Sequence, residues 1–234
     1  MSRSEGQMES SSATSRPPVS GAVVVGVDGS DSAEVAVRWA AALAAAEGRV
    51  LVLACGTAEP GPLWLEPPMV HPFDYAGAIR DAAQRNLESA HGVAHEAAPD
   101  LEIREILEAG DPRSLLLELS QSAAMVVVGS SGRGPLRRVM LGSVGVAVVR
   151  LSSCPAVVVP SGRPPSEDHR VVVGTDGSEA GAPVLEFAAD QATRRGVPLV
   201  VVLCRLDVAR WTGRPGADQG PDPAMDALES RLAA

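Results

Sequence analysis

Val23-Val24-Val25-Gly26-Val27-Asp28-Gly29-Ser30 is the stretch from which the architecture of this chain can be worked out. A continuous β-branched run that ends in a polar turn predicts a strand covered on both faces, as in a parallel sheet. Ser30 or Asp31 can cap the Ala-rich helix that follows, and Gly48 can end it. The stretch therefore predicts the first strand–helix unit of an α/β fold.

Three further apolar runs and one alternating run continue this pattern. We expect strands at 50–54, 101–107, 125–128 and 156–159, and helices at 31–47, 73–97, 112–122 and 143–151. Apolar and charged residues alternate over 101–107, which indicates an edge strand with one wet face. Asp111-Pro112 predicts a helix start, with Asp as the cap and Pro at the first helical position. Strand–helix alternation with right-handed crossovers predicts a doubly wound five-stranded parallel sheet with helices on both faces.

The strands that begin at residues 23 and 125 both end in glycine and a polar loop. If these strands lie side by side at a topological switch point, the two loops face each other across one crevice. We therefore expect a binding site at the carboxyl ends of these two strands.

The chain repeats its opening stretch 148 residues later. Val171-Val172-Val173-Gly174-Thr175-Asp176-Gly177-Ser178 restates residues 23–30, and residues 199–204 restate 51–55 loosely after a one-residue insertion. We expect a disordered polar tail at 1–20, a complete domain at 21–160, a Pro-rich linker at 161–169 and a truncated second domain at 170–234. The second copy has no counterpart of residues 110–160, and it ends in a short predicted helix at 225–232.

The composition argues against several classes of protein. The 234 residues are 45% hydrophobic and carry a net charge of −9, which disfavours a nucleic-acid backbone or an anionic membrane as the main partner. We expect no transmembrane helix and no secretory signal, because no run of about 18 apolar residues and no apolar N-terminal segment occurs. Cys55, Cys154 and Cys204 are too scattered for a disulfide framework or a zinc site, so we expect reduced thiols in the cytoplasm.

Residues 129–144 form a Gly-rich stretch that leads into a predicted helix. Glycines allow backbone N–H groups to approach an anion closely. Gly142-Ser143 opens the helix, whose free N–H groups and dipole favour phosphate, and the Ser143 hydroxyl can add a donor or a cap. Positive charge comes from three arginines of the same stretch, Arg133, Arg137 and Arg138. The spacing alone is equally compatible with an ordinary Gly-rich surface loop, and no Gly-Lys-Ser/Thr of a P-loop follows the glycines.

The spacing Gly129-x2-Gly132-x9-Gly142-Ser143 resembles the nucleotide-binding signature of the universal stress protein family. Three other stretches resemble the same family in chain order, namely Val25–Ser30, Gly110-Asp111-Pro112 and Ser153–Val159. The resemblance covers residues 20–160 as a whole domain and 170–234 as the front half of another. It implies an adenine-nucleotide α-hydrolase-like domain that binds ATP or a related adenine nucleotide.

Position by position, the resemblance also implies a set of binding residues. Gly26, Val27 and Asp28 would line the adenosine, and Cys55 would lie beside the adenine. The ribose and phosphates would lie against residues of the Gly-rich stretch, namely Gly129, Gly132, Arg133, Gly142, Ser143 and Val144. A Mg²⁺ or Mn²⁺ ion would be held through the phosphates, without a metal ligand or a catalytic residue from the protein. The family also implies a homodimer or a pairing of the two repeats within the chain.

These observations lead us to expect a cytoplasmic, ATP-binding stress-response sensor or regulator. Hydrolysis would be slow at most, because the sequence offers no evident general base, catalytic lysine or carboxylate cluster for a metal. Two alternatives stay open, a nucleotide-independent dimerising interaction module and a slow hydrolase that cleaves between the α- and β-phosphates. His91 and His95, four residues apart on a predicted helix, could bind a metal, although a solvated helical face is the favoured interpretation.

Overall fold

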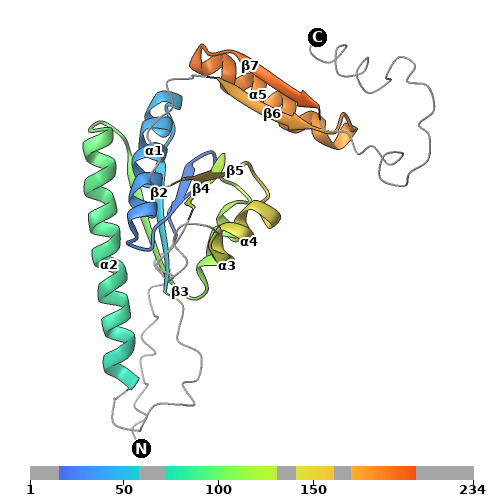
Figure 1. Ribbon diagram of the computed structural model, residues 1–234. Helices are drawn as coiled ribbons and strands as arrows, with labels where there is room; N and C mark the ends of the chain where they lie inside the picture. The colour runs from blue at the N-terminus through green and yellow to red at the C-terminus, as the bar shows by residue number, and fades with distance from the viewer. Residues whose placement is uncertain (1–15, 58–71, 131–140, 161–169, 204–234) are drawn as a thin grey trace, which may run out of the picture. The chain divides into compact units, whose positions relative to one another are not determined.

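The computed structural model describes residues 16–57, 72–130, 141–160 and 170–203 (Figure 1). The chain divides into two compact units, residues 1–163 and 164–234. Within the described ranges, no helix combines the length and the apolar character that a membrane crossing requires.

Unit 1, residues 1–163, is built on a five-stranded parallel sheet in the order β3-β2-β1-β4-β5. The strands are β1 (Val23–Gly26), β2 (Leu51–Thr57), β3 (Ile103–Ala109), β4 (Met125–Gly129) and β5 (Ala156–Val159). Val23 pairs with Leu51 on one side and with Met125 on the other, so β1 and β4 are neighbours as the sequence predicts. The alternating strand β3 lies at the edge, and the predicted fold class is confirmed.

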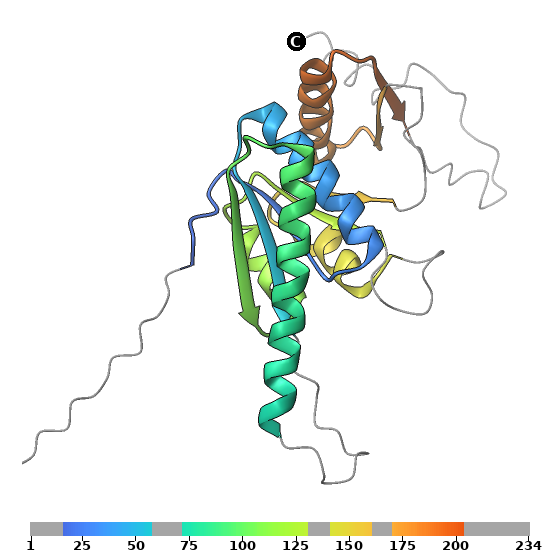
Figure 2. The same cartoon turned by 90° about the vertical axis from the view of Figure 1, so that its left-hand side faces the viewer.

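Helices cover both faces of this sheet (Figures 1 and 2). The first face is covered by α1 (Asp31–Glu47) and α2 (Pro72–Ala97), and the second by α3 (Pro112–Leu119) and α4 (Ser143–Leu151). On the second face, Leu116 of α3 and Val148 of α4 are buried in one apolar cluster with Val24 of β1. Because β1 is covered on both sides, Val23, Val24 and Val25 are all 0% exposed.

The helix ends follow from local side-chain chemistry. Ser30, rather than Asp31, caps α1, and its Oγ accepts a hydrogen bond of 3.2 Å from the amide of Ala33. Gly48 ends α1 in the left-handed conformation, at a φ of +62°. Asp111 caps α3 through the amide of Arg113, with Pro in the first turn, as predicted.

Residues 16–20 differ from the expected tail, because the structure packs them against unit 1. Val19 is only 9% exposed and belongs to the apolar cluster under α3. Arg16 donates to Glu108 of β3 at 2.7 Å and to Glu118 of α3 at 2.6 Å. These residues are therefore part of the packed unit, and the rest of the expected tail, residues 1–15, lies outside the described residues.

Gly129 lies where the first turn of α1 comes closest to the sheet. A Cβ at this position would be 2.6 Å from the carbonyl oxygen of Ser32 and 3.0 Å from the amide of Ala33. Both neighbours are backbone atoms, so they cannot swing away as a side chain would. Packing of α1 on β4 therefore requires glycine here, independently of any ligand.

Unit 2 contains β6 (Val171–Thr175), the short 3-10 helix η1 (Glu179–Gly181), α5 (Ala182–Arg195) and β7 (Leu199–Leu203). The two strands are parallel, and α5 buries Leu185 and Ala188 against them. Val171 pairs with Leu199 as Val23 pairs with Leu51, a shift of 148 residues in both strands. The prediction of a one-residue insertion before residue 199 is therefore wrong, because the offset of 148 is unchanged there. The helix predicted at 225–232 lies outside the described residues.

The contact at Gly129 gives a direct test of this packing. We expect Gly129→Ala to lower the free energy of unfolding by about 1–3 kcal/mol, because the added methyl group forces α1 away from β4. The matched control is Gly77→Ala on α2, where a Cβ meets nothing within 4 Å. That variant should gain up to about 1 kcal/mol from helix propensity. Urea unfolding followed by circular dichroism measures both, and an unchanged Gly129→Ala midpoint would contradict the packing.

Candidate functional site

The carboxyl ends of β1 and β4 form the topological switch point of the sheet. From β1 the sheet continues through β2 and β3 on one side and through β4 and β5 on the other. Extending the Val25–Val127 pairing by two residues brings Val27 and Gly129 level with each other. Loops that follow neighbouring strands at such a point border one crevice, which is where ligands bind in open α/β sheets.

The turn after β1 holds a carboxylate at the edge of this crevice. Asp28 Oδ1 accepts hydrogen bonds from the Ser30 amide at 2.9 Å and from Ser30 Oγ at 2.6 Å. Gly29 makes the turn possible at a φ of +74°, a conformation that favours glycine. The side chain of Asp28 is exposed, and both bonds use Oδ1, so Oδ2 can accept from a ligand.

Asn86 of α2 also reaches this turn, which the sequence did not indicate. Its Nδ2 donates to the backbone oxygen of Asp28 at 3.3 Å. Ala83 and Leu87, at 5% and 1% exposure, anchor this part of α2, so the helix presents Asn86 at the turn. The sequence offers little sign of this contact, because Asn86 is a single amide side chain beside the apolar residues of its helix and lies 58 residues from Asp28.

The floor of the crevice is apolar and tightly packed. Val27 and Cys55 are only 6% and 4% exposed, and Cys55 forms no disulfide with Cys154, the other described cysteine. A Cβ at Gly26 would be 3.1 Å from Leu116 Cδ1, so this glycine allows α3 to approach the sheet. These three predicted residues do lie together at the ends of β1 and β2, where they can contact a ligand mainly through backbone and apolar surface.

Among the described residues, no side chain caps the backbone N–H groups at the start of α4. Gly142 occupies the N-cap position at a φ of −60° and makes no side-chain hydrogen bond, so Ser143 is the first helical residue rather than the cap. Ser143 is exposed, and Val144 follows it in the first turn, which contains no acidic residue. Uncapped N–H groups and the helix dipole together favour an anion at this end.

Two predicted residues, Gly132 and Arg133, lie outside the described residues, together with Arg137 and Arg138. In the described ranges, no group of three or more His, Cys, Asp or Glu is arranged to hold a metal ion. His91, considered as a metal ligand above, has its Nδ1 2.7 Å from Oε1 of Glu105 on β3.

Unit 2 repeats the turn but not its surroundings. Asp176 Oδ1 accepts from the Ser178 amide at 2.9 Å, as Asp28 does from Ser30. Hydrogen bonds from the side chain and amide of Ser178 lower the pKa of the exposed Asp176 carboxyl. Among the residues described in unit 2, no third strand lies beside this turn, so we interpret it as structural.

Comparison with known proteins places this architecture. The model of the universal stress protein family matches residues 21–160 and 169–233. A universal stress protein of Mycobacterium tuberculosis is 36% identical over 200 residues, which are 83% of this chain and 67% of the relative. A second one from the same species is 34% identical over 223 residues, 90% of this chain and 73% of the relative.

Among solved structures, a universal stress protein from Archaeoglobus fulgidus DSM 4304 matches 91% of this chain and 72% of its own. Its TM-score is 0.64 at 18% identity, a likeness of fold alone. The family match and the two mycobacterial relatives together extend over most of the sequence. This chain therefore belongs to the universal stress protein family.

Proposed function

We propose that unit 1 binds ATP or a related adenine nucleotide at the ends of β1 and β4, and that the protein acts as a stress-response sensor or regulator. The observation that supports this proposal most strongly is the position of the Asp28 turn beside the end of β4 at the switch point, together with a start of α4 that no described side chain caps. A carboxylate suits the hydroxyl groups of a ribose, whereas bare N–H groups suit phosphate. Family membership adds the role in the stress response.

In this proposal the adenosine lies on the apolar floor formed by Gly26, Val27 and Cys55. The exposed carboxylate of Asp28 accepts a hydrogen bond from a ribose hydroxyl, while Asn86 steadies the turn through its backbone oxygen. The buried floor excludes water from one face of the base, which favours stacking of a flat, apolar ring system.

The phosphates then extend toward α4. Gly129, Gly142, Ser143 and Val144 border their path, and the Gly-rich loop would add Gly132 and Arg133. A chain with a net charge of −9 needs local positive charge to hold a polyphosphate, and the arginines of this loop would supply it. A Mg²⁺ or Mn²⁺ ion would be coordinated mainly by the phosphates.

We further propose that the protein works in the cytoplasm as a homodimer. Cys55 and Cys154, the two described cysteines, form no disulfide with each other, which suits a reducing compartment. Burial raises the pKa of the Cys154 thiol, so that it stays protonated at neutral pH. β5 is an edge strand of valines and alanine with half-buried side chains, and an apolar edge favours pairing with a second copy.

Nucleotide binding should stabilise unit 1 in a way that depends on the glycines near the phosphates. ATP at 100 times its dissociation constant should add about 2.7 kcal/mol, or roughly 5–15 °C in Tm. We expect the double variant Gly132→Val and Gly142→Val to abolish this shift, because its side chains fill the space of the phosphates. Gly77→Val with Gly92→Val, at two open helical positions, should keep the shift. A full ATP-induced shift in the first variant, read by differential scanning fluorimetry, would refute the site.

Asp28 and its repeat copy Asp176 form a matched pair for testing ribose recognition. Asp28→Ala should weaken ATP binding about tenfold or more, because a hydrogen bond to a charged group contributes about 1.5–3 kcal/mol. It should also remove the preference for ATP over 2′,3′-dideoxy-ATP. Asp176→Ala removes the same turn bond in unit 2 and should leave both affinities unchanged. Isothermal titration calorimetry of the two variants with the two nucleotides measures this. If Asp28→Ala lost the same affinity for ATP and for 2′,3′-dideoxy-ATP, the Asp28 turn would act only structurally.

A further inference from the structure

Two buried hydroxyl groups lie directly behind the exposed carboxylate of Asp28. Ser30 and Ser32 are only 6% and 4% exposed. Ser30 Oγ lies 2.6 Å from Asp28 Oδ1 and 3.1 Å from Ser32 Oγ. The three side chains therefore form a continuous chain of hydrogen bonds from the turn after β1 into the first turn of α1.

The direction of these hydrogen bonds follows from the number of donors. A serine hydroxyl has one hydrogen to donate and two lone pairs that accept. Ser30 donates to Asp28, because the carboxylate is charged and its oxygen is the nearer acceptor. Ser30 Oγ also accepts from the amide of Ala33 at 3.2 Å, which leaves one lone pair for the hydroxyl of Ser32. Each bond in the chain then polarises the next one toward Asp28, which strengthens the bond to Oδ1.

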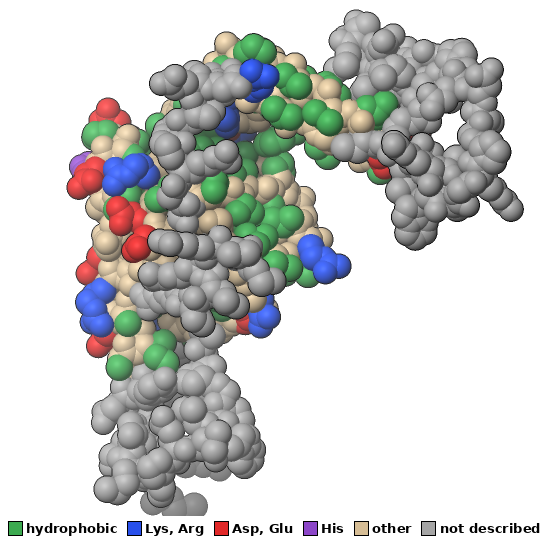
Figure 3. Space-filling view, in the orientation of Figure 1, with side chains coloured by type: hydrophobic (Ala, Val, Ile, Leu, Met, Phe, Trp, Pro, Cys, Tyr) green, Lys and Arg blue, Asp and Glu red, His purple; other side chains and the backbone are tan. Residues whose placement is uncertain are grey.

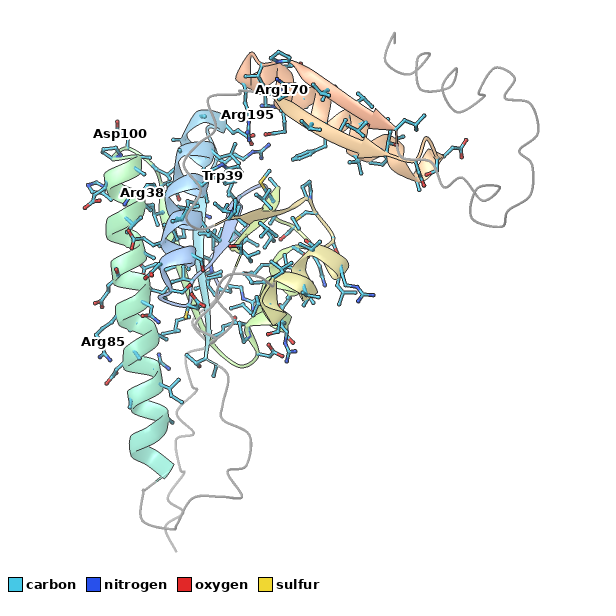
Figure 4. The ribbon with its side chains drawn as sticks, in the orientation of Figure 1. Arg38, Trp39, Arg85, Asp100, Arg170 and Arg195 are labelled. Carbon is cyan, nitrogen blue, oxygen red and sulfur yellow. The ribbon has the colours of Figure 1, made fainter. Side chains whose placement is uncertain are left out.

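Neutral donors, rather than a cation, hold this carboxylate among the described residues. None of the ion pairs between described residues includes Asp28. Charged side chains do line the outer side of α2 (Figure 3), but Arg85 of this helix points away from the sheet (Figure 4). Arg38 of α1 pairs instead with Glu34 and Glu96. The orientation of the Asp28 carboxylate therefore depends on the hydrogen bonds of its own turn.

Unit 2 repeats the turn without the second hydroxyl. Asp176 accepts from the amide of Ser178 at 2.9 Å, but Ala180 stands where unit 1 has Ser32. Ser178 makes no side-chain cap bond, and the 3-10 helix η1 follows it in place of a regular first turn. The acidic turn thus forms in this chain with an alanine at the second position, so that Ser32 is not needed to make the turn.

The backbone of Ser32 is fixed by the packing of α1 on the sheet. Its carbonyl oxygen is the atom that a Cβ at Gly129 would meet at 2.6 Å. This close packing gives the Ser32 hydroxyl a defined place from which it donates to Ser30. Alanine at position 32 would keep the backbone contact with Gly129 and remove only the hydroxyl.

We propose that Ser30 and Ser32 are positioning residues of the nucleotide site, Ser30 directly and Ser32 through Ser30. They hold Oδ1 of Asp28 against the protein, so that Oδ2 is presented to the ribose hydroxyls. This inference rests on the proposed function, because it names the residues that set the ribose preference of the same site.

The readout is the preference for ATP over 2′,3′-dideoxy-ATP, measured on the full chain by isothermal titration calorimetry. This ratio isolates the contribution of the ribose hydroxyls, which a general loss of stability does not change. We expect Ser32→Ala to reduce the preference about three- to fivefold, the effect of one neutral hydrogen bond, and to leave the affinity for the dideoxy nucleotide unchanged. Ser30→Ala should reduce the preference further, and its Tm should fall because α1 loses its cap. Ser32→Cys, which keeps the size and donates weakly, should fall between Ser32→Ala and the unaltered chain.

The matched control is Ser120→Ala, at a second buried serine of unit 1. Ser120 is 2% exposed, and its Oγ donates to the Leu117 oxygen at 2.7 Å and accepts from the Ser153 amide at 3.0 Å. Because Ser120 lies at the end of α3, outside the candidate site, its loss should lower Tm and leave the ribose preference unchanged.

A double-mutant cycle tests whether Ser32 acts through Asp28. In the Asp28→Ala background, Ser32→Ala should weaken ATP binding no further. An unchanged preference in Ser32→Ala, a further loss in the double variant, or an equal fall in Ser120→Ala would overturn the proposal. Absence of ATP binding by the unaltered chain, or a full ribose preference in Asp28→Ala, would refute the nucleotide site itself and this inference with it.

Discussion

The burial of β1 is the constraint on which the rest of unit 1 depends. This strand is paired on both edges and covered on both faces, so Val23, Val24 and Val25 lose all contact with solvent. Its carboxyl end then opens at the crevice bordered by the loops after β1 and β4, with α1 starting directly beyond it. Gly129 lacks a Cβ, and this allows the backbone of Ser32 in α1 to pack directly on the end of β4. The groups of the candidate site are held in place by the same packing that stabilises the fold.

The sequence predicted those features that local chemistry controls. The valine runs located the central strands, the alternating run located the edge strand β3, and Asp111-Pro112 located the start of α3. Prediction failed where long-range contacts decide. Arg16 is ordered by carboxylates that come from β3 and α3, and no local pattern reveals partners about a hundred residues away. The contact of Asn86 with the turn after β1 was missed for the same reason. The packing role of Gly129 depends on α1, which lies outside the Gly-rich motif in the sequence.

The two copies of the opening stretch show that a motif acquires its role from its surroundings. Both copies form the same parallel pair and the same acidic turn, with Asp28 and Asp176 bonded alike to a following serine. In unit 1 the turn lies beside the end of β4 at the switch point of the sheet, where ligands bind in open α/β sheets. In the described part of unit 2 no third strand lies beside the turn, and the uncovered strands present an apolar face instead. The surroundings of the first copy therefore favour a ligand site, whereas the turn of the second copy is interpreted as structural.

A crystal structure of the chain grown with ATP and Mg²⁺ tests the central claim most directly. We expect a nucleotide in the crevice between β1 and β4, with a ribose hydroxyl bonded to Asp28 and the phosphates at the amides of Ser143 and Val144. A nucleotide bound elsewhere on the chain, or an empty crevice at saturating ATP, would contradict it.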